Sequence, residues 1–497
     1  LGALFEATKY WTVADRNQLL PALEGGLLGN RLLWLGISAA LLALAYGRFR
    51  MEPPARSEGA RPAAGNTPAP APRTLARPGR AAVWEPLWAM VRLDMAFVFR
   101  SPAFGVLVAL GLFNALGALQ GVSEMRGIPY FPVTRAVVDA LWGAFSIIPI
   151  IIAIYYGGEL VWRDREYRIH EIVDASAAPD WTFVLPKVLA IALVLLATLL
   201  AGALGGLIFQ LYEGYTDVQP VSYLLWFVLP MLISAMQVAI LSVFVQTLAP
   251  AKAAGWALML IYVVASVALA TTGFEHRLYN YGDAATVPLS DMNGMGHFWV
   301  ARAWHQLYWS AFALMLLVAS QLLWRRGAET RLRPRLARLP LRLRGPAGAA
   351  MAVFALTWVG SGAFVYYNSN VLNRYITTPE REAMQAEAEK QLLPLEKTLQ
   401  PTVTHVNLDV AIYPRERFAV TEGSYTLENR HAEPIRELLL QTPPELRIER
   451  IEMPGATLER EYADFGFRVY RLAQALQPGE KQVLRFATRM QERGFPN

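Results

Sequence analysis

A His-Glu pair at positions 170 and 171 is the first place where this sequence could carry catalytic chemistry. Zinc peptidases place such a pair on a helix and add a second His one turn later, so that both imidazoles bind the metal from one face. Here Asp174 occupies the position of the second His. Asp can bind zinc, but no further ligand is apparent nearby in the sequence. The pattern therefore does not predict a metal site, and no catalytic or metal-binding residue is predicted.

The same stretch, "GGELVWRDREYRIHEIVDASAAPDW", predicts a charged helix between two apolar segments. The helix is expected over about residues 160–175, broken by Ser176 and Pro179, with Asp180 capping the next helix. One side is apolar, and the other carries charge. Such a helix is either a solvated connection or a surface through which a soluble partner moves the membrane part, using complementary charge. The candidate contact residues are Arg163, Asp164, Arg165, Glu166, Arg168, His170 and Glu171.

The composition indicates a membrane protein. Of the 497 residues, 54% are hydrophobic and only 17% are charged, whereas a soluble protein carries about 25% charged residues. The absence of Cys excludes disulfides, thiolate metal sites and Cys nucleophiles. The net charge of +6 comes from arginine clusters, which we interpret as topology signals and anionic-lipid contacts rather than as a nucleic-acid surface.

Eight segments are apolar enough to be predicted as membrane-spanning helices, each needing about 20 residues. If all eight are spans, the basic residues that flank them fall on one side, which is then the cytoplasm. Residues 1–30 and everything after 368 would lie outside the cytoplasm. The predicted spans are residues 31–47, 102–121, 137–158, 186–210, 222–247, 254–272, 305–324 and 348–367.

Two segments before the second span have a different character. Residues 51–83 are rich in Pro, Ala, Gly and Arg, and we predict a disordered cytoplasmic linker. Residues 84–102 place Trp84, Leu87, Trp88, Val91 and Met95 at helical spacing, with Arg92 and Asp94 off that stripe. We predict an amphipathic helix on the membrane surface, the alternative being the start of the next span.

After the last span the pattern changes from helix to strand. Residues 379–397 predict a charged helical connector that is interrupted at Pro394. Apolar and polar residues then alternate over 406–412, and further strands are expected near 418–428, 446–452, 465–471 and 482–489. The predicted fold is a polytopic α-helical membrane protein with about eight transmembrane helices and a C-terminal extracytoplasmic antiparallel β domain of sandwich or saddle type.

The order of these elements resembles half of a type-2 ABC-exporter permease: an interfacial helix, two spans, a charged cytoplasmic helix and four more spans. "GELVWRDREYRIHEIVDA", "LYNYG", "PLSDMNGMGHF" and "YWTVADRNQLLPALEG" are similar to bacterial permeases fused to a zinc aminopeptidase. "YTLENRHAEPI" and "LQPGEKQVLRF" resemble the start of the aminopeptidase's N-terminal β domain. The resemblance implies a bacterial inner-membrane location and a coupling helix that docks into a cytoplasmic ABC ATPase subunit.

The resemblance also implies a domain plan. The sequence begins with Leu1, and we expect it to be a fragment that lacks the first permease half and most of the peptidase. The expected parts are the last helix of a preceding half (1–50), the linker (51–83), a six-helix permease half (84–324), a basic cytoplasmic loop (325–347), an extra transmembrane helix (348–367), a helical connector (368–400) and the truncated β domain (401–497).

The motifs for chemistry that this family would use do not occur in the sequence. It has no His-Glu-x-x-His, no Gly-x-Met-Glu-Asn and no phosphate-binding Gly-x-x-x-x-Gly-Lys-Ser/Thr loop. We therefore expect no cofactor in this chain, with ATP on a partner subunit and zinc on the missing aminopeptidase domain. Whether the full-length protein is a zinc metallo-aminopeptidase is a question that this sequence leaves open.

Three functions are compatible with these observations. The chain is a permease subunit of an exporter powered by a separate ATPase, or a membrane anchor for a zinc aminopeptidase that transports nothing. A third possibility is a permease that uses ATP for work outside the cytoplasm without moving a substrate. The aromatic-rich loop 273–309 is either a substrate or metal gate or an aromatic cap at the membrane surface. Its candidate residues are Tyr281, Asp291, Asn293 and His297.

Overall fold

The computed structural model describes residues 11–12, 22, 24–48, 84–125, 128–175, 179–326, 332–443 and 446–497. The chain forms two compact units, residues 1–77 and 78–497. The described helix of the first unit is α3 (Gly25–Arg48), whose Leu32, Leu33 and Trp34 are each 59% exposed. The predicted linker over residues 51–83 lies outside the described residues.

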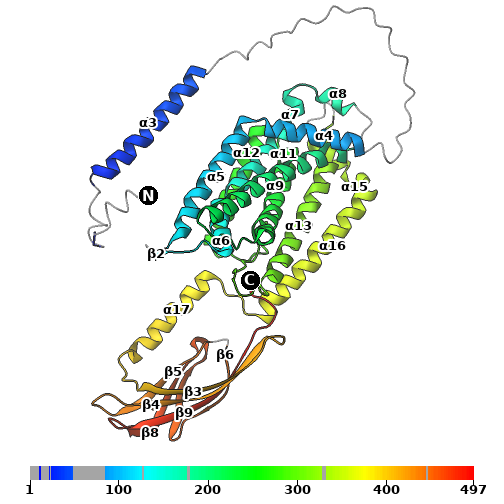
Figure 1. The fold of residues 1–497 in the computed structure, drawn as a ribbon. Helices are drawn as coiled ribbons and strands as arrows, with labels where there is room; N and C mark the ends of the chain where they lie inside the picture. Colours follow the sequence, from blue (N-terminus) through cyan, green and yellow to red (C-terminus); the bar gives the residue numbers. More distant parts are fainter. Residues whose placement is uncertain are drawn as a thin grey trace, which may run out of the picture. The chain divides into compact units, whose positions relative to one another are not determined.

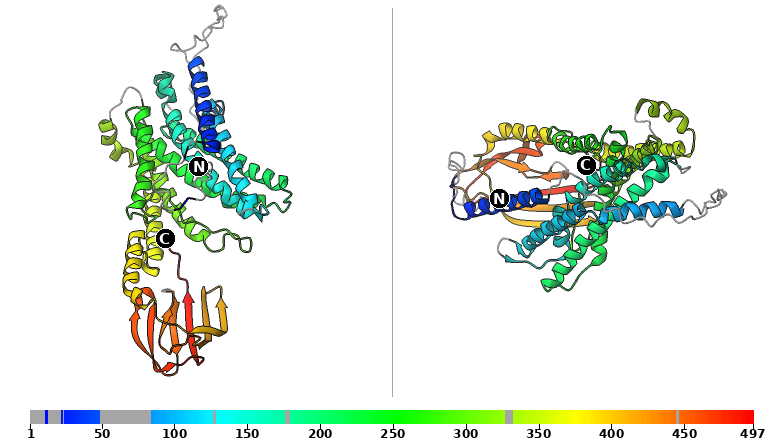
Figure 2. Two further views of the ribbon diagram at one scale, coloured as in Figure 1. Left: turned by 90° about the vertical axis from the view of Figure 1, so that its left-hand side faces the viewer. Right: turned by 90° about the horizontal axis from the view of Figure 1, so that it is seen from above.

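The second unit begins with a bundle of helices that run side by side (Figures 1 and 2). A short hairpin of β1 (Glu124–Met125) and β2 (Ile128–Pro129) follows α5 (Pro102–Ser123). The helices are α4 (Trp84–Phe99), α5 (Pro102–Ser123), α6 (Thr134–Ala144), α7 (Ile148–Glu166), α8 (His170–Asp174), α9 (Trp181–Tyr212), α10 (Pro220–Tyr223), the π-helical turn η2 (Leu224–Val228), α11 (Leu229–Leu248), α12 (Lys252–Thr271) and α13 (Trp299–Leu322).

Every predicted span falls on a helix, but not every helix qualifies as a span. Six described helices are long and apolar enough to cross a membrane, or up to seven if α6 and α7, which are bent by 42°, form one span. The helix α13 is not among them, because it carries Arg302, His305 and Gln306 within its first turns. These apolar helices fit the predicted multi-pass membrane-associated protein, and the count of about eight spans stays a prediction.

The predicted apolar stripe of α4 is wrong in one position. Leu87, Val91 and Val98 are at most 4% exposed, and Asp94 is only 2% exposed between them. These residues recur every three or four positions and form one buried face, whereas Trp88 is 54% exposed. Asp94 thus belongs to the buried face of α4, where its charge needs a partner from another helix.

Close approach of α7 to its neighbours depends on a glycine pair. A Cβ atom on Gly157 would lie 2.3 Å from Ser242 Oγ of α11, and one on Gly158 would lie 2.2 Å from Trp256 Nε1 of α12. Only glycine allows backbone and side chain to approach this closely. The pair that ends the apolar run therefore packs α7 against both α11 and α12.

The chain after the bundle comprises α14 (Leu332–Ala337), α15 (Leu339–Arg342), α16 (Pro346–Tyr366), the π-helical segment η3 (Tyr367–Leu372), α17 (Thr378–Leu392) and the turn η4 (Leu393–Leu395). Aromatic rings join α16 to α13, with Trp358 stacked on Tyr308 at 5.5 Å between centroids. The connector helix α17 starts where Thr377 and Glu380 form a reciprocal capping box. The predicted interruption at Pro394 is the turn η4.

The C-terminal strands form two antiparallel sheets that share a core. One sheet has the order β3-β4-β9-β6, and the other has the order β5-β8-β7. Leu427, Leu438, Leu472 and Leu484 are buried together from strands of both sheets, so the fold is a sandwich. The strands are β3 (Thr402–Tyr413), β4 (Phe418–Glu428), β5 (Ile435–Gln441), β6 (Leu446–Glu452), β7 (Ala456–Tyr462), β8 (Phe467–Leu476) and β9 (Lys481–Gln491), with the turn η5 (Ala463–Phe465).

The sequence pattern missed β5 and β7. The β7 sequence "ATLEREY" is mostly exposed and rich in charge, so it lacks the alternation that marks a half-buried strand. The β5 sequence "IRELLLQ" has three successive leucines, which do not distinguish a strand from a helix. Both strands are held by pairing with β8, a contact that local patterns do not report.

Candidate functional site

The predicted single helix over residues 160–175 is two helices in the structure. The helix α7 ends at Glu166, and Arg168 has a φ of 56°, in the left-handed region that non-glycine residues rarely adopt. The Ile169 N–H donates to the Asp164 carbonyl at 3.0 Å, which closes the turn before the short helix α8. Ser176, predicted to break the helix, lies outside the described residues. Figure 1 shows α8 at one end of the bundle, beyond α7.

The first charged residues of this stretch, Arg163 and Asp164, are largely buried within the helix bundle. Arg163 is paired with Asp94 of α4, and it also donates to Asp164 at 3.1 Å. Asp164 in turn accepts from Lys187 of α9 at 3.4 Å. The four side chains are at most 14% exposed. This buried chain of alternating charges ties the end of α7 to α4 and α9, and the partner of the buried Asp94 is therefore Arg163.

A second set of ion pairs ties α7 to α12. Lys252 Nζ lies 2.9 Å from Glu159 Oε1 and 2.7 Å from Glu166 Oε1. The same ammonium group lies 5.0 Å from the centroid of the Trp256 ring, which adds a cation–π contact. Because both carboxylates belong to α7 and the ammonium to α12, movement of the end of α7 would carry α12 with it.

The exposed part of the stretch is the turn and the short helix, residues 167–174, which we name the tip. Its apolar side chains are open to solvent, with Ile172 79% exposed and Tyr167 56% exposed. Arg168 and Glu171 are exposed beside them. A patch of exposed apolar side chains with polar neighbours is typical of a docking surface. The sequence prediction concentrated on charge and missed Tyr167 and Ile172 as exposed residues.

The candidate contact residues are therefore divided by the structure. Arg163 is buried, Asp164 is largely buried, and Arg165 and His170 are half-buried. Glu166 is 46% exposed although it pairs with Lys252. The exposed candidates are thus Glu166, Arg168 and Glu171. The signal that could have found the division is spacing, since Arg163 follows the buried Tyr156 and Leu160 at intervals of four and three along one face of α7.

The basic segment after α13 packs on the neighbouring turn. Arg326 Nη1 donates to Asp180 at 3.0 Å, and Arg342 Nη1 donates to the same carboxylate at 3.2 Å. Arg326 also donates to the Asp174 carbonyl of α8 at 3.0 Å. Asp180 occupies the N-cap position of α9, as predicted, but its side chain makes no capping hydrogen bond. These arginines hold the end of α8 and the start of α9 together.

The four candidate residues of loop 273–309 do not converge. Tyr281 is packed among aromatic rings, and its hydroxyl donates to the Gln237 carbonyl at 2.7 Å. Asp291 pairs with Arg135 at 3.3 Å, and Asn293 lies on the same exposed turn. His297 Nε2 lies 3.5 Å from Glu492 Oε2 at the end of β9. The arrangement does not form one gate, and the four residues serve separate contacts.

A different part of this loop forms a polar joint with the chain that follows α16. His276 Nε2 lies 2.9 Å from Asn370 Oδ1 and 3.2 Å from Ser369 Oγ, both in η3. The Leu278 N–H donates to His276 Nδ1 at 3.1 Å. Burial lowers the pKa of His276, and nearby Arg277 lowers it further. The imidazole is therefore held neutral, with its Nε2–H donated to Asn370 and its Nδ1 accepting.

The joint also includes the segment after β9, residues 492–497. Asn373 Nδ2 donates to the Arg493 carbonyl at 2.8 Å and to the Phe495 carbonyl at 3.3 Å. Phe495 is 7% exposed and packs with Ala285, Ala301 and Val365. Gly494 has a φ of 59° and approaches Asn368 so closely that a Cβ atom would lie 2.3 Å from its Oδ1. The polar run "NSNVLN" after the last apolar helix was the available sequence signal for this contact.

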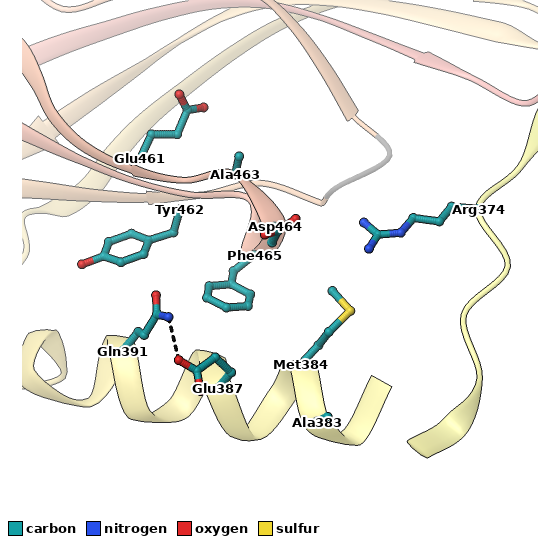
Figure 3. Close-up of a pocket in the computed structure, with 10 residues that line it drawn as sticks. All are labelled: Arg374, Ala383, Met384, Glu387, Gln391, Glu461, Tyr462, Ala463, Asp464 and Phe465. Carbon is teal, nitrogen blue, oxygen red and sulfur yellow. Dashed lines mark hydrogen bonds between the residues drawn. The ribbon is translucent and has the colours of Figure 1, made fainter. Parts of the chain in front are cut away.

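The largest cleft of those described lies between α17 and the turn that follows β7 (Figure 3). It has a volume of about 550 Å³, with Arg374 at one side and Glu387 on α17, whose carboxylate accepts from Gln391 at 2.7 Å. Glu461 is already paired with Arg468 at 2.7 Å. In the described part of the chain no group of three His, Asp or Glu side chains is placed to hold a metal ion. The cleft thus offers mixed charge and apolar surface.

Comparison with protein-family models, with curated proteins and with solved structures found no match to this chain. The resemblance to permeases and aminopeptidases therefore stays a prediction from the sequence phrases. The structure supplies the helices of a multi-pass membrane-associated protein, an antiparallel C-terminal sandwich, a tip that is exposed and a joint that is buried.

Proposed function

We propose that this chain is a permease subunit of an ABC-type exporter in the bacterial inner membrane, powered by a separate cytoplasmic ATPase and linked to an extracytoplasmic aminopeptidase module. The observation that carries the proposal is the contrast between an exposed tip and a buried base. Ile172 of the tip is 79% exposed, whereas Arg163 and Asp94 at the base are buried and paired. A docking surface mounted on a rigid base suits the transmission of force.

The mechanism follows from the contacts at the base. When the ATPase subunits close, their movement displaces the tip and therefore the end of α7. The ion pairs of Arg163 and Asp164 pass the displacement to α4 and α9, and Lys252 passes it to α12. Because the pairs of Arg163 and Asp164 are at most 14% exposed, they are little screened by salt and tie the helices firmly. ATP binds to the partner subunit, and zinc belongs to an aminopeptidase domain, so the described residues supply positioning.

The alternative is a membrane anchor that transports nothing. The joint favours it, because the sandwich and the segment after β9 are fixed to loop 273–298 and to η3 through His276, Asn373 and Phe495. An anchor needs such a fixed attachment, but it has no need of an exposed tip. The tip therefore favours the exporter over the anchor.

Co-purification with the ATPase tests the proposal. The tip variant combines Arg168→Glu with Ile172→Asp, and the control Arg415→Glu reverses an exposed charge in the sandwich. Crosslinked wild-type protein should yield a stoichiometric nucleotide-binding subunit, the control should retain it, and the tip variant should lose most of it. Retention by the tip variant would contradict the docking assignment. If wild-type protein yields no ATPase even after crosslinking, the result favours the anchor over the exporter.

A further inference from the structure

A small pocket lies at the end of the bundle that carries the tip. It has a volume of about 20 Å³ and lies between the end of α7, the end of α11 and the residues just after α13. A cavity of this size holds one water-sized group. We name it the arginine pocket, and it is lined by Val161, Trp162, Arg165, Gln246, Thr247, Trp324 and Arg325.

The two arginines of the pocket have donors without acceptors. Arg325 is 8% exposed, and its Nε is buried with no hydrogen-bond partner. The Nη2 of Arg165 is buried and likewise has no partner. Among the ion pairs of the described residues, none joins a carboxylate to Arg165 or to Arg325. Burying guanidinium groups without a counter-charge is costly, which indicates a missing anion.

The other contacts of Arg325 fix its position without neutralising its charge. Its Nη2 donates to the Ala249 carbonyl and, at 3.3 Å, to the Leu248 carbonyl. Its guanidinium lies 5.2 Å from the centroid of the Trp162 ring, whose Nε1 donates to Gln246 at 2.8 Å. Burial lowers the pKa of Arg325 to about 10, and the charges of Arg335 and Arg165 contribute. Positive charges therefore meet here in a fixed arrangement.

We propose that the arginine pocket binds an anionic phosphate group, with one phosphate oxygen inserted between the guanidinium groups of Arg165 and Arg325. The volume admits one oxygen, so the rest of the group lies at the mouth. Guanidinium is the preferred protein partner of phosphate. The source that we favour is an anionic phospholipid, because Trp162 and Trp324 flank the pocket and tryptophan concentrates at the level of the headgroups. The inference does not depend on transport or on the ATPase.

Thermal unfolding of the detergent-purified full chain tests the site. The protein is measured with phosphatidylglycerol, with phosphatidylcholine and with inorganic phosphate, in wild type, Arg165→Gln and Arg325→Gln. The control is Arg338→Gln, which removes an exposed arginine from the same basic segment. Phosphatidylglycerol should raise the unfolding temperature of wild type and of the control by about 2–4 °C, and the pocket variants should lose most of that rise.

The outcomes separate the sources of the anion. An equal rise with inorganic phosphate keeps the anion site but assigns it to free phosphate rather than to lipid. No rise with either anion, or an equal loss in Arg338→Gln, overturns the proposal, since the pocket then holds water or the effect is general charge. If Arg325→Gln does not fold, Arg165→Gln decides, because Arg165 is only half-buried. In anion-free detergent, Arg165→Gln should also be at least as stable as wild type, because it relieves repulsion.

Discussion

Arg163 is the residue on which the base of the tip depends. Its side chain is 9% exposed, and it pairs with two carboxylates, those of Asp94 and Asp164, the second of which is shared with Lys187. Removing the partner of a buried charge is far more damaging than removing an exposed pair, because the remaining charge is left without water. Arg163 is therefore the partner on which the buried charge of Asp94 depends.

We expect Arg163→Ala to destabilise the protein by about 3–5 kcal/mol, because Asp94 is left buried without its partner. The free energy of unfolding in mixed detergent micelles measures this loss. The control is Arg135→Ala, which breaks two partly exposed pairs, with Asp139 and with Asp291, and should cost about 0–1 kcal/mol for each. Adding Asp94→Asn should recover part of the loss in Arg163→Ala. Equal costs for Arg163→Ala and Arg135→Ala would contradict the buried network.

Protonation of His276 should loosen the joint. Its pKa is lowered in the folded protein, whereas in the unfolded chain it is about 6.5. Below about pH 6.5 the unfolded state therefore binds more protons, and stability falls as the pH decreases toward the lowered pKa. Protonated Nδ1 would also lose its role as acceptor for the Leu278 N–H. Arg277 and the rings of Tyr279 and Tyr375 are its other neighbours.

The measurement is protease cleavage within residues 273–278 between pH 7.5 and 5.5. Cleavage should rise as the pH falls in wild type, and it should be nearly independent of pH in His276→Gln, which keeps hydrogen-bonding capacity without a titrating ring. The control His431→Gln changes an exposed histidine of the sandwich. A pH dependence that persists unchanged in His276→Gln would place the titrating group elsewhere.

At the scale of elements, α7 is the helix that contacts α4, α9, α11 and α12. Its glycine pair allows contact with α11 and α12, and its charged end reaches α4, α9 and α12. The bend between α6 and α7 is placed just before Pro149, in the first turn of α7, where proline is tolerated. A rigid α7 with a short α8 beyond it is the shape that a coupling element needs.

We expect Gly158→Leu to separate α7 from α12, because even a Cβ atom at this position would lie 2.2 Å from Trp256 Nε1. The loss of stability should be about 1–3 kcal/mol, in the range for overpacking, and the unfolding temperature measures it. The matched control is Gly117→Ala in α5, where a Cβ atom would meet nothing within 4 Å. That control should be neutral or slightly stabilising. An unchanged unfolding temperature in Gly158→Leu would contradict the close contact between α7 and α12.

At the scale of the whole second unit, the joint is the contact that connects the sandwich with the helices. Phe495 fills an apolar site formed by loop 273–298, α13 and α16. Asn373 donates to the backbone carbonyls of Arg493 and Phe495, and the Arg277 N–H donates to Asn497 Oδ1. A sandwich attached at both α17 and residues 492–497 is fixed at two points. Its orientation therefore follows the helices more closely than a single connector would allow.

Phe495→Ala should release the segment after β9, because deletion of a buried Phe costs about 3–5 kcal/mol. Limited proteolysis after β9 should increase, while the sandwich itself stays folded, since its core lies elsewhere. Ile412→Ala on the exposed strand β3 is the control, because Ile412 is 69% exposed and should be insensitive. Unfolding of the sandwich together with the segment would contradict an independent joint.

Local chemistry determined the elements of this protein. Hydropathy placed a helix at each predicted span, and alternation located β3, β4 and β9, because both depend on neighbouring side chains. The same reasoning failed for β5 and β7, whose pairing with β8 is not local. Hydropathy likewise does not report the contacts that polar residues of α13 make within the chain, such as that of Arg302 with the Ala285 carbonyl.

Tertiary structure alone decided which polar residues are buried and which are free to bind. Asp94 and Arg163 are 69 positions apart, and His276 and Asn370 are 94 positions apart. Local patterns do not identify such pairs, because the type of a charged residue is the same whether its side chain is exposed to water or buried against a partner. The sequence by itself was sufficient to predict a chain of several apolar helices, with a charged stretch after the glycine pair of α7. Folding then buried Arg163 and exposed Ile172, since only packing decides which side of a helix meets another helix.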